Sequence, residues 1–201
     1  MILPNKDKIL SMIPHFGKTV KDLFTKEEFE MLLNFRPISG QKRFVPCSAI
    51  SKFKWLTTNW QTDPSSWPSS YVNEVIHKTS ILFRDCSKVN KKVNNFCAML
   101  EGIFKKPVDC HIYYSHLTQN ATFGKHRDKQ HNVIVCVKGK QNCTVYGKEK
   151  ISKIMLPGDY VFIPKDIDHN ISPLEDGRIS LSFCSSSDED YNFEDRSWIN
   201  I

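Results

Sequence analysis

Residues 132–146 read NVIVCVKGKQNCTVY, and this stretch decides the class of fold. Its first part, Asn132 to Val137, is a run of apolar and β-branched residues with the length and composition of a buried strand. Residues 142–146 alternate between polar and apolar side chains, which indicates a second strand. Lys138-Gly139-Lys140 lies between them as a tight turn, so the stretch predicts a β-hairpin.

Further short strands are expected on the C-terminal side of this hairpin. They cover Ile151 to Leu156, Tyr160 to Ile163 and Ile179 to Phe183, with Gly, Pro or Asp residues between them. Many short strands at close spacing are typical of an antiparallel sandwich or barrel. The sequence therefore predicts a mainly β fold.

Two helices are expected before these strands. Thr25 precedes a first turn rich in acidic residues, so a helix should begin there and run to about Phe35. Ser87 is expected to cap a second helix, which ends at Lys105-Lys106-Pro107. The apolar positions of this second helix recur at intervals of three and four and form one stripe that faces the core: Val89, Val93, Phe96, Cys97, Leu100, Ile103 and Phe104.

Histidine and acidic residues flank the predicted strands. GKHRD occupies positions 124–128, and LPGDYVFIP at 156–164 is followed by His169. Residues two apart on a strand project from the same face, so His126 and Asp128 can reach one metal ion, and a second strand can bring His169 to it. Two histidines and one carboxylate leave open positions on an octahedral ion, as in non-haem Fe(II) oxygenases. The alternative is a surface histidine beside an aspartate that closes a turn.

The order of these motifs resembles a known family. Gly-x-His-x-Asp, an apolar strand, Lys-Gly-Lys, Pro-Gly-Asp-x-x-x-Ile-Pro and a final histidine look like the JmjC and cupin-like 2-oxoglutarate oxygenases. They are similar in particular to the ribosomal oxygenases and to the asparaginyl hydroxylase acting on hypoxia-inducible factor. The resemblance covers roughly residues 87–184. It implies a double-stranded β-helix of the jelly-roll or cupin type beginning with a strand at Val108 to Ser115, Fe(II) and 2-oxoglutarate as cofactors, and hydroxylation of a side chain on a peptide or protein.

The resemblance also implies roles for individual residues. It makes His126, Asp128 and His169 the metal ligands and catalytic residues, and it places Asn132 near the co-substrate. The lysine that many JmjC enzymes use to hold the far carboxylate of 2-oxoglutarate falls on Gln141, whose neutral amide brings no charge.

Arg178 is the candidate for the missing cation. A buried dicarboxylate needs a cation, because a desolvated and unpaired carboxylate is costly. Arg178 and Ser180 share one face of a strand by alternation and resemble the Arg-x-Ser of other 2-oxoglutarate oxygenases. We expect Arg178 to bind the far carboxylate, with Ser180, Gln141 and Tyr113 assisting. The alternative for Arg178 is a solvated residue at the start of a strand.

The composition is that of an ordinary globular protein. The chain has 201 residues, of which 40% are hydrophobic and 25% charged, so one domain with a sizeable core is expected. The net charge of +6 permits acidic partners without demanding them, and no specific nucleic-acid motif is present. No segment reads as a membrane span. Seven cysteines without a Cys-x-x-Cys spacing argue against disulfides, so a reducing, cytoplasmic location is expected.

Three parts of this single domain are expected. Residues 1–106 should form a helical and irregular layer, residues 107–184 the double-stranded β-helix core, and residues 185–201 an acidic and aromatic tail. The tail is expected either to act as an arm or simply to pack against the domain.

Several alternatives remain open at the level of the sequence. Trp55, Trp60 and Trp67 lie among Pro and Ser residues, where they can cover the sheet or line a substrate groove. The same oxidative chemistry could act on a small-molecule metabolite. The chain could also be a cupin metalloprotein that does not use 2-oxoglutarate, or a barrel that only binds a peptide.

Overall fold

The computed structural model describes residues 6–18, 22–34, 47–51, 54–55, 77, 80–84, 86–120 and 122–186. The predictions for Trp60, Trp67 and the tail after residue 186 lie outside this part of the chain, as does the side chain of Trp55.

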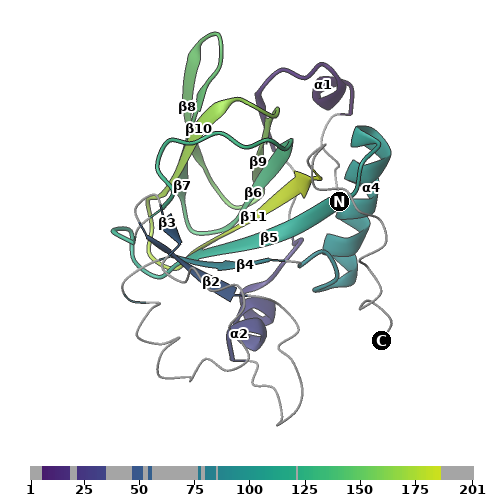
Figure 1. The fold of residues 1–201 in the computed structure, drawn as a ribbon. Coiled ribbons are helices and arrows are strands. Elements are labelled where there is room, and N and C mark those ends of the chain that lie inside the picture. The colour runs from purple at the N-terminus through teal and green to yellow at the C-terminus, as the bar shows by residue number, and fades with distance from the viewer. Residues whose placement is uncertain are drawn as a thin grey trace.

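The described strands form two antiparallel sheets (Figure 1). The large sheet has the order β1 (His15–Lys18), β9 (Asp159–Ile163), β6 (Asn132–Lys138), β11 (Arg178–Ser185), β5 (Val108–Ser115), β4 (Ile81–Phe83), β2 (Cys47–Ser51) and β3 (Lys54–Trp55). The small sheet has the order β10 (Asp168–Pro173), β7 (Gln141–Tyr146) and β8 (Lys150–Met155).

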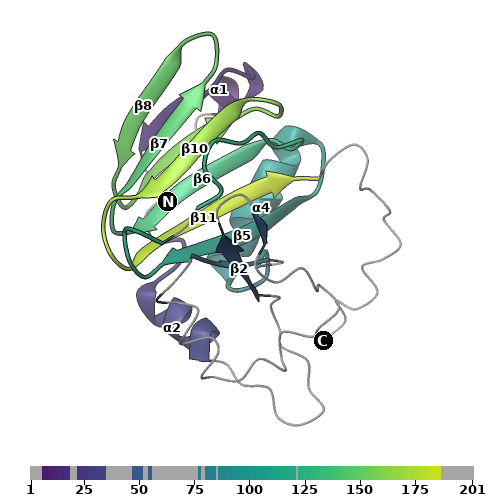
Figure 2. The ribbon, with the colours of Figure 1, turned by 60° about the vertical axis from the view of Figure 1, so that its left-hand side comes forward.

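Apolar side chains from both sheets pack against one another. Ile134 and Val161 of the large sheet lie in one buried cluster with Cys143 and Val145 of the small sheet. Figure 2 shows β8, β7 and β10 side by side in the small sheet, and β6, β11 and β5 side by side in the large sheet. The prediction of a mainly β, double-stranded β-helix fold is confirmed.

The predicted hairpin at residues 132–146 is wrong in its pairing. Both strands form, but β6 belongs to the large sheet and β7 to the small one. The edges of β6 are taken by β9 and β11, so β7 cannot pair with it and pairs with β10 and β8 instead. Gly139 between them has a φ of 72°, which favours glycine, and the turn carries the chain from one sheet to the other.

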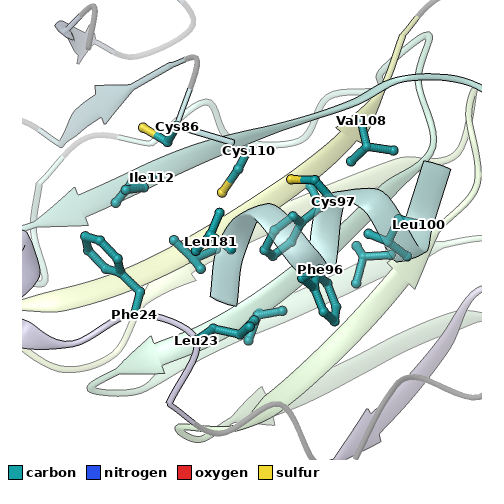
Figure 3. Close-up of a cluster of buried hydrophobic side chains, with 14 of the residues drawn as sticks. Leu23, Phe24, Cys86, Phe96, Cys97, Leu100, Val108, Cys110, Ile112 and Leu181 are labelled. Carbon is teal, nitrogen blue, oxygen red and sulfur yellow. The ribbon is translucent and has the colours of Figure 1, made fainter. Parts of the chain in front are cut away.

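A second apolar core lies between the large sheet and α4 (Lys91–Phe104). Figure 3 shows Phe96 and Leu100 of this helix beside Leu181 of β11. Every residue of β11 is buried. Helix α4 packs on one face of the strand, and the other face points into the interior between the two sheets. The side chains of β11 alternate accordingly: Ile179, Leu181 and Phe183 pack toward α4, and Arg178, Ser180, Ser182 and Cys184 point between the sheets.

Helices α2 (Lys26–Asn34) and α4 both begin after a residue whose side chain caps the first turn. In α2, Glu28 N donates to Thr25 Oγ1 at 3.1 Å and Thr25 N donates to Glu28 Oε2 at 2.8 Å, a reciprocal cap that confirms the predicted start. The start of α4 at Ser87 was wrong. Asn90 is extended and accepts from Val93 N at 2.8 Å, so the helix begins at Lys91.

The region before residue 107 contributes strands as well as helices. Strand β1 extends the large sheet by pairing with β9, and β4 extends it at the other side by pairing with β5. A short helix, α1 (Lys6–Leu10), precedes β1. The division of the chain at residues 106 and 184 stays a prediction. None of the described helices has both the length and the apolar character needed to cross a membrane.

Candidate metal centre

Three side chains converge at one end of the two sheets. His126, Asp128 and His169 each offer a ligand atom, and these atoms all lie within 4.8 Å of one another. The Nε2 atom of His126 is 3.9 Å from Oδ1 of Asp128, and Nε2 of His169 is 3.5 Å from Oδ2 of the same carboxylate. The predicted ligands are therefore brought together around one point.

Backbone hydrogen bonds hold the two ligand segments side by side. His126 N donates to His169 O at 2.9 Å, and His169 N donates to His126 O at 2.7 Å, which is the exchange expected of a hydrogen-bonded antiparallel pair. Further along the same two segments, Asp166 N donates to Asp128 O at 2.8 Å. Main-chain hydrogen bonds thus position the segments that carry the three ligands.

The residues between the ligands face outward. Arg127 Nε lies 2.7 Å from Asp168 Oδ1, and Lys125 Nζ lies 3.2 Å from Asp168 Oδ2. Since these cations are largely exposed, their ion pairs add little to stability. They do confirm the alternation that sends His126, Asp128 and His169 to the other side.

Both histidines present the same ring nitrogen to Asp128. His126 Nδ1 lies 2.9 Å from Gly124 O, and His169 Nδ1 lies 3.0 Å from Ile167 O. A carbonyl oxygen can only accept, so Nδ1 carries the proton and Nε2 keeps its lone pair. Burial, and then the neighbouring His126, lower the pKa of His169, which favours its neutral form. Neutral imidazoles with Nε2 turned inward are suited to bind a metal ion.

Asn132 orients the carboxylate of this group. It lies at the start of β6, is buried, and donates from Nδ2 to Asp128 Oδ2 at 2.5 Å. The resemblance to oxygenases placed Asn132 near the co-substrate. In the structure its amide contacts Asp128, and Asn132 is not among the described residues that line the adjoining cavity.

Arg178 is a buried cation on the other side of that cavity. Its side chain donates from Nη1 to Ser180 Oγ at 2.6 Å and from Nη2 to Ser115 Oγ at 2.7 Å. Its Nε has no hydrogen-bond partner, and burial lowers the pKa of the guanidinium to about 10. Within the described part of the chain, no carboxylate lies within ion-pair distance of it.

One cavity joins the metal cluster to this cation. Among the residues that line it are His126, Asp128, His169, Tyr113, Ser180 and Arg178. Burial raises the pKa of Tyr113, so its hydroxyl remains protonated and can donate. The structure therefore brings six of the eight predicted site residues to one cavity, and its described lining includes neither Asn132 nor Gln141.

Gln141 lies in a different environment. It is fully buried in β7, where Nε2 points to Met155 Sδ at 3.6 Å. The neighbouring Lys140 is exposed and forms an ion pair with Glu175 at 3.7 Å, because alternation turns its side chain away from that of Gln141. An assisting role for Gln141 at the co-substrate stays a prediction.

Two serines near the cavity were missed from the sequence. Ser115 is buried, accepts from Arg178 and lies 2.7 Å, oxygen to oxygen, from Ser80, which lines the cavity. Strand alternation from Tyr113 could have placed Ser115 on the inner face of β5. Its position opposite Arg178 is set by the pairing of β5 with β11, which no local pattern contains.

Comparison with known proteins rests on structure alone. No protein-family model matches the chain, and no curated protein matches it. A structure of YcfD, a ribosomal oxygenase from Escherichia coli, in complex with cobalt and 2-oxoglutarate, is 16% identical and has a TM-score of 0.55 over 88% of this chain. A crystal structure of the same ribosomal oxygenase is 15% identical, with a TM-score of 0.61 over 94% of this chain.

These comparisons show the fold that the two proteins share. The chain spans about half the length of these structures, 49% and 54%. The resemblance to JmjC and cupin-like 2-oxoglutarate oxygenases is therefore confirmed for the fold of the chain.

Proposed function

We propose that this protein is an Fe(II)- and 2-oxoglutarate-dependent dioxygenase that hydroxylates a side chain of a peptide or protein. The observation that carries the proposal is Arg178, a buried cation that faces the same cavity as His126, Asp128 and His169. A guanidinium in this position, bonded only to hydroxyl groups among the described residues, is suited to bind an anion that enters the cavity.

The donor set supports a metal of this class. Two neutral imidazoles and one carboxylate are the ligands that non-haem Fe(II) uses when open positions are kept for co-substrate and dioxygen. His126 and His169 both keep Nε2 available, and Asn132 holds the carboxylate of Asp128 in place. These three ligands would hold the iron.

The opposite side of the cavity supports a dicarboxylate co-substrate. Arg178 would bind the far carboxylate of 2-oxoglutarate, with Nε as a donor that has no acceptor among the described residues. Ser115 and Ser180 hold the guanidinium from two strands, so its fork is oriented before the ligand arrives. Tyr113 lies in the same lining, and its hydroxyl can donate a further hydrogen bond.

The side chains of the protein would position the iron and 2-oxoglutarate and would keep the cavity around them dry. Iron and 2-oxoglutarate, when bound, supply the oxidising chemistry that no side chain can provide. Asn132 orients the carboxylate of Asp128, and the Nδ1 hydrogen bonds of the two histidines orient their rings with Nε2 toward that carboxylate. Burial of Arg178 and Ser180 keeps water from competing for the carboxylate.

A second cavity supports a side chain as the substrate. It has a volume of about 380 Å³ and shares His126 and Asp128 with the first cavity. Its walls include Leu82, Phe123 and Gln130, so both apolar and polar groups are available to a side chain that enters beside the metal ligands. The ribosomal oxygenase with the same fold supports this choice over a metabolite.

Anaerobic spectroscopy tests the proposal. Fe(II) and 2-oxoglutarate added together should produce a visible absorption band from the iron chelate, and admission of oxygen should release succinate. His169→Ala should remove the band, while Lys129→Ala, which changes an exposed residue beside Asp128, should keep it. A metal that binds without any band from 2-oxoglutarate would indicate a cupin metalloprotein of another kind. If a metabolite stimulates succinate formation and no peptide does, the substrate is a small molecule and not a protein.

A further inference from the structure

Three side chains that the proposed reaction does not use form a chain of contacts beside the metal ligands. Cys184 Sγ lies 3.9 Å from His111 Nδ1, and His111 Nε2 lies 3.2 Å from Asp109 Oδ2. The three come from adjacent strands, since Cys184 of β11 is directly opposite Asp109 of β5. Thiol, imidazole and carboxylate are thus held in series by the sheet register.

This cluster opens onto the cavity of about 380 Å³. Cys184 and His111 line that cavity together with His126 and Asp128. Cys184 lies on the same inward face of β11 as Arg178, at the other end of the strand. A small reagent that enters the cavity can therefore reach the thiol without unfolding the protein.

The imidazole between the two groups has both ring nitrogens engaged. Burial alone would lower the pKa of His111, but Cys184 and Asp109 outweigh it and raise the pKa to about 10. The ring is then protonated near neutral pH, with one N–H toward sulfur and the other toward the carboxylate. A neighbouring imidazolium stabilises a thiolate, and the thiolate is the nucleophilic form of cysteine.

Three other cysteines, Cys97, Cys110 and Cys143, lie in apolar surroundings. Cys97 and Cys110 lie in the apolar core under α4, and Cys143 lies in the cluster between the sheets. Burial raises the pKa of the Cys143 thiol to about 12 and raises that of Cys110 as well. Buried thiols of this kind are inert, so the described chain contains an internal set of controls.

We propose that Cys184 is a peroxide-reactive thiol that His111 and Asp109 activate. The thiolate attacks one oxygen of a hydroperoxide, so that an S–O bond forms while the O–O bond breaks. Cysteine is oxidised to a sulfenic acid and the peroxide is reduced by two electrons. The proton on His111 Nδ1 goes to the departing oxygen, which leaves as water or an alcohol. The new oxygen stands on the wall of the cavity that also holds His126 and Asp128.

The test uses the full chain after treatment with a chelator, so it does not depend on iron or on the proposed function. Dilute hydrogen peroxide is added with dimedone, which traps sulfenic acids, and mass spectrometry follows each cysteine-containing peptide. Cys184 should be trapped at least about tenfold faster than Cys97, Cys110 or Cys143. Trapping of Cys184 at the same rate as Cys143 would overturn the proposal.

Two variants test the role of the neighbouring groups. His111→Gln should slow trapping of Cys184 about tenfold or more, and Asp109→Asn should slow it by a smaller factor. Cys143→Ser is the matched control and should leave the rate at Cys184 unchanged. An unaltered rate in His111→Gln would contradict activation by the imidazole. If a variant is unstable, Cys143 becomes reactive in it, which identifies the loss of structure. The trapping rates of Cys184 and Cys143 in the wild-type chain then test the proposal.

Discussion

The two sheets are covered differently, although both contribute to the candidate metal centre. In the large sheet, every residue of β9 and β11 is buried. In the small sheet, all but the last residue of β8 are exposed, and Ile151 and Ile154 face solvent. The large sheet carries the buried cation Arg178, whereas the small sheet carries His169.

The difference in burial between the two sheets explains why the cation Arg178 lies on the large sheet and His169 on the small one. A cation without an acidic partner costs free energy through desolvation, and only an extensively packed strand can offset that cost. Strand β11 has this packing, because α4 and the inner core cover its two faces. His169 is uncharged and is held by its backbone bridge to His126, so it does not need a sheet that is covered on both faces.

The largest expected effect compares the two sheets directly. Leu181→Ala removes a fully buried side chain under α4 and should lower the free energy of unfolding by about 2–5 kcal/mol. Ile154→Ala, on the exposed face of β8, should change it by less than about 0.5 kcal/mol. Chemical denaturation of both variants measures the contrast. Equal losses would mean that the outer face of the small sheet is also covered.

The second prediction concerns the metal ligands. His169→Ala should weaken binding of Fe(II) or Co(II) by more than about 100-fold, and His126→Ala and Asp128→Ala should do the same. Thermal unfolding of the metal-free variants should stay near that of the wild type, because the backbone bridge between the ligand segments remains. Calorimetric titration gives the affinity. Full metal affinity in His169→Ala would exclude the three-ligand centre.

Arg178 should show the next largest effect. Arg178→Ala should raise the 2-oxoglutarate concentration needed for half-maximal succinate release by about 10- to 100-fold, the cost of losing a charge-assisted pair. Arg178→Lys should recover part of the loss, because an ammonium lacks the fork of the guanidinium. Metal affinity should be retained in both variants. If the 2-oxoglutarate dependence were unchanged in Arg178→Ala, the co-substrate would bind elsewhere or not be used.

The smallest effect is expected at Asn132, which joins the large sheet to the metal ligands. Asn132→Ala should weaken metal binding by about tenfold, because Asp128 would lose the donor that orients it. Asn142→Ala is the control, since Asn142 donates to Thr144 in the small sheet. Titration with Co(II) compares the two. A normal affinity in Asn132→Ala would show that the backbone alone orients Asp128.

Patterns within a few residues predicted much of this protein. The strands at 132–138 and 159–163, the cap at Thr25 and the shared face of His126 and Asp128 follow from alternation and turn chemistry. Arg178 and Ser180 were correctly assigned to one face of a strand by the same rule. The cap of α4 was misplaced because Ser87 and Asn90 both carry capping side chains, and only the backbone distinguishes them.

Local patterns predicted several of the core strands and the side chains that share a face, because these depend on neighbours along the chain. The strands before residue 107 and the pairing of all strands followed from the folded structure. It separated β6 from β7, set Ser115 opposite Arg178, and placed Cys184 opposite Asp109. The physical reason is that pairing depends on which strand edges remain open and on how both sheets bury their apolar faces, a condition on the whole chain.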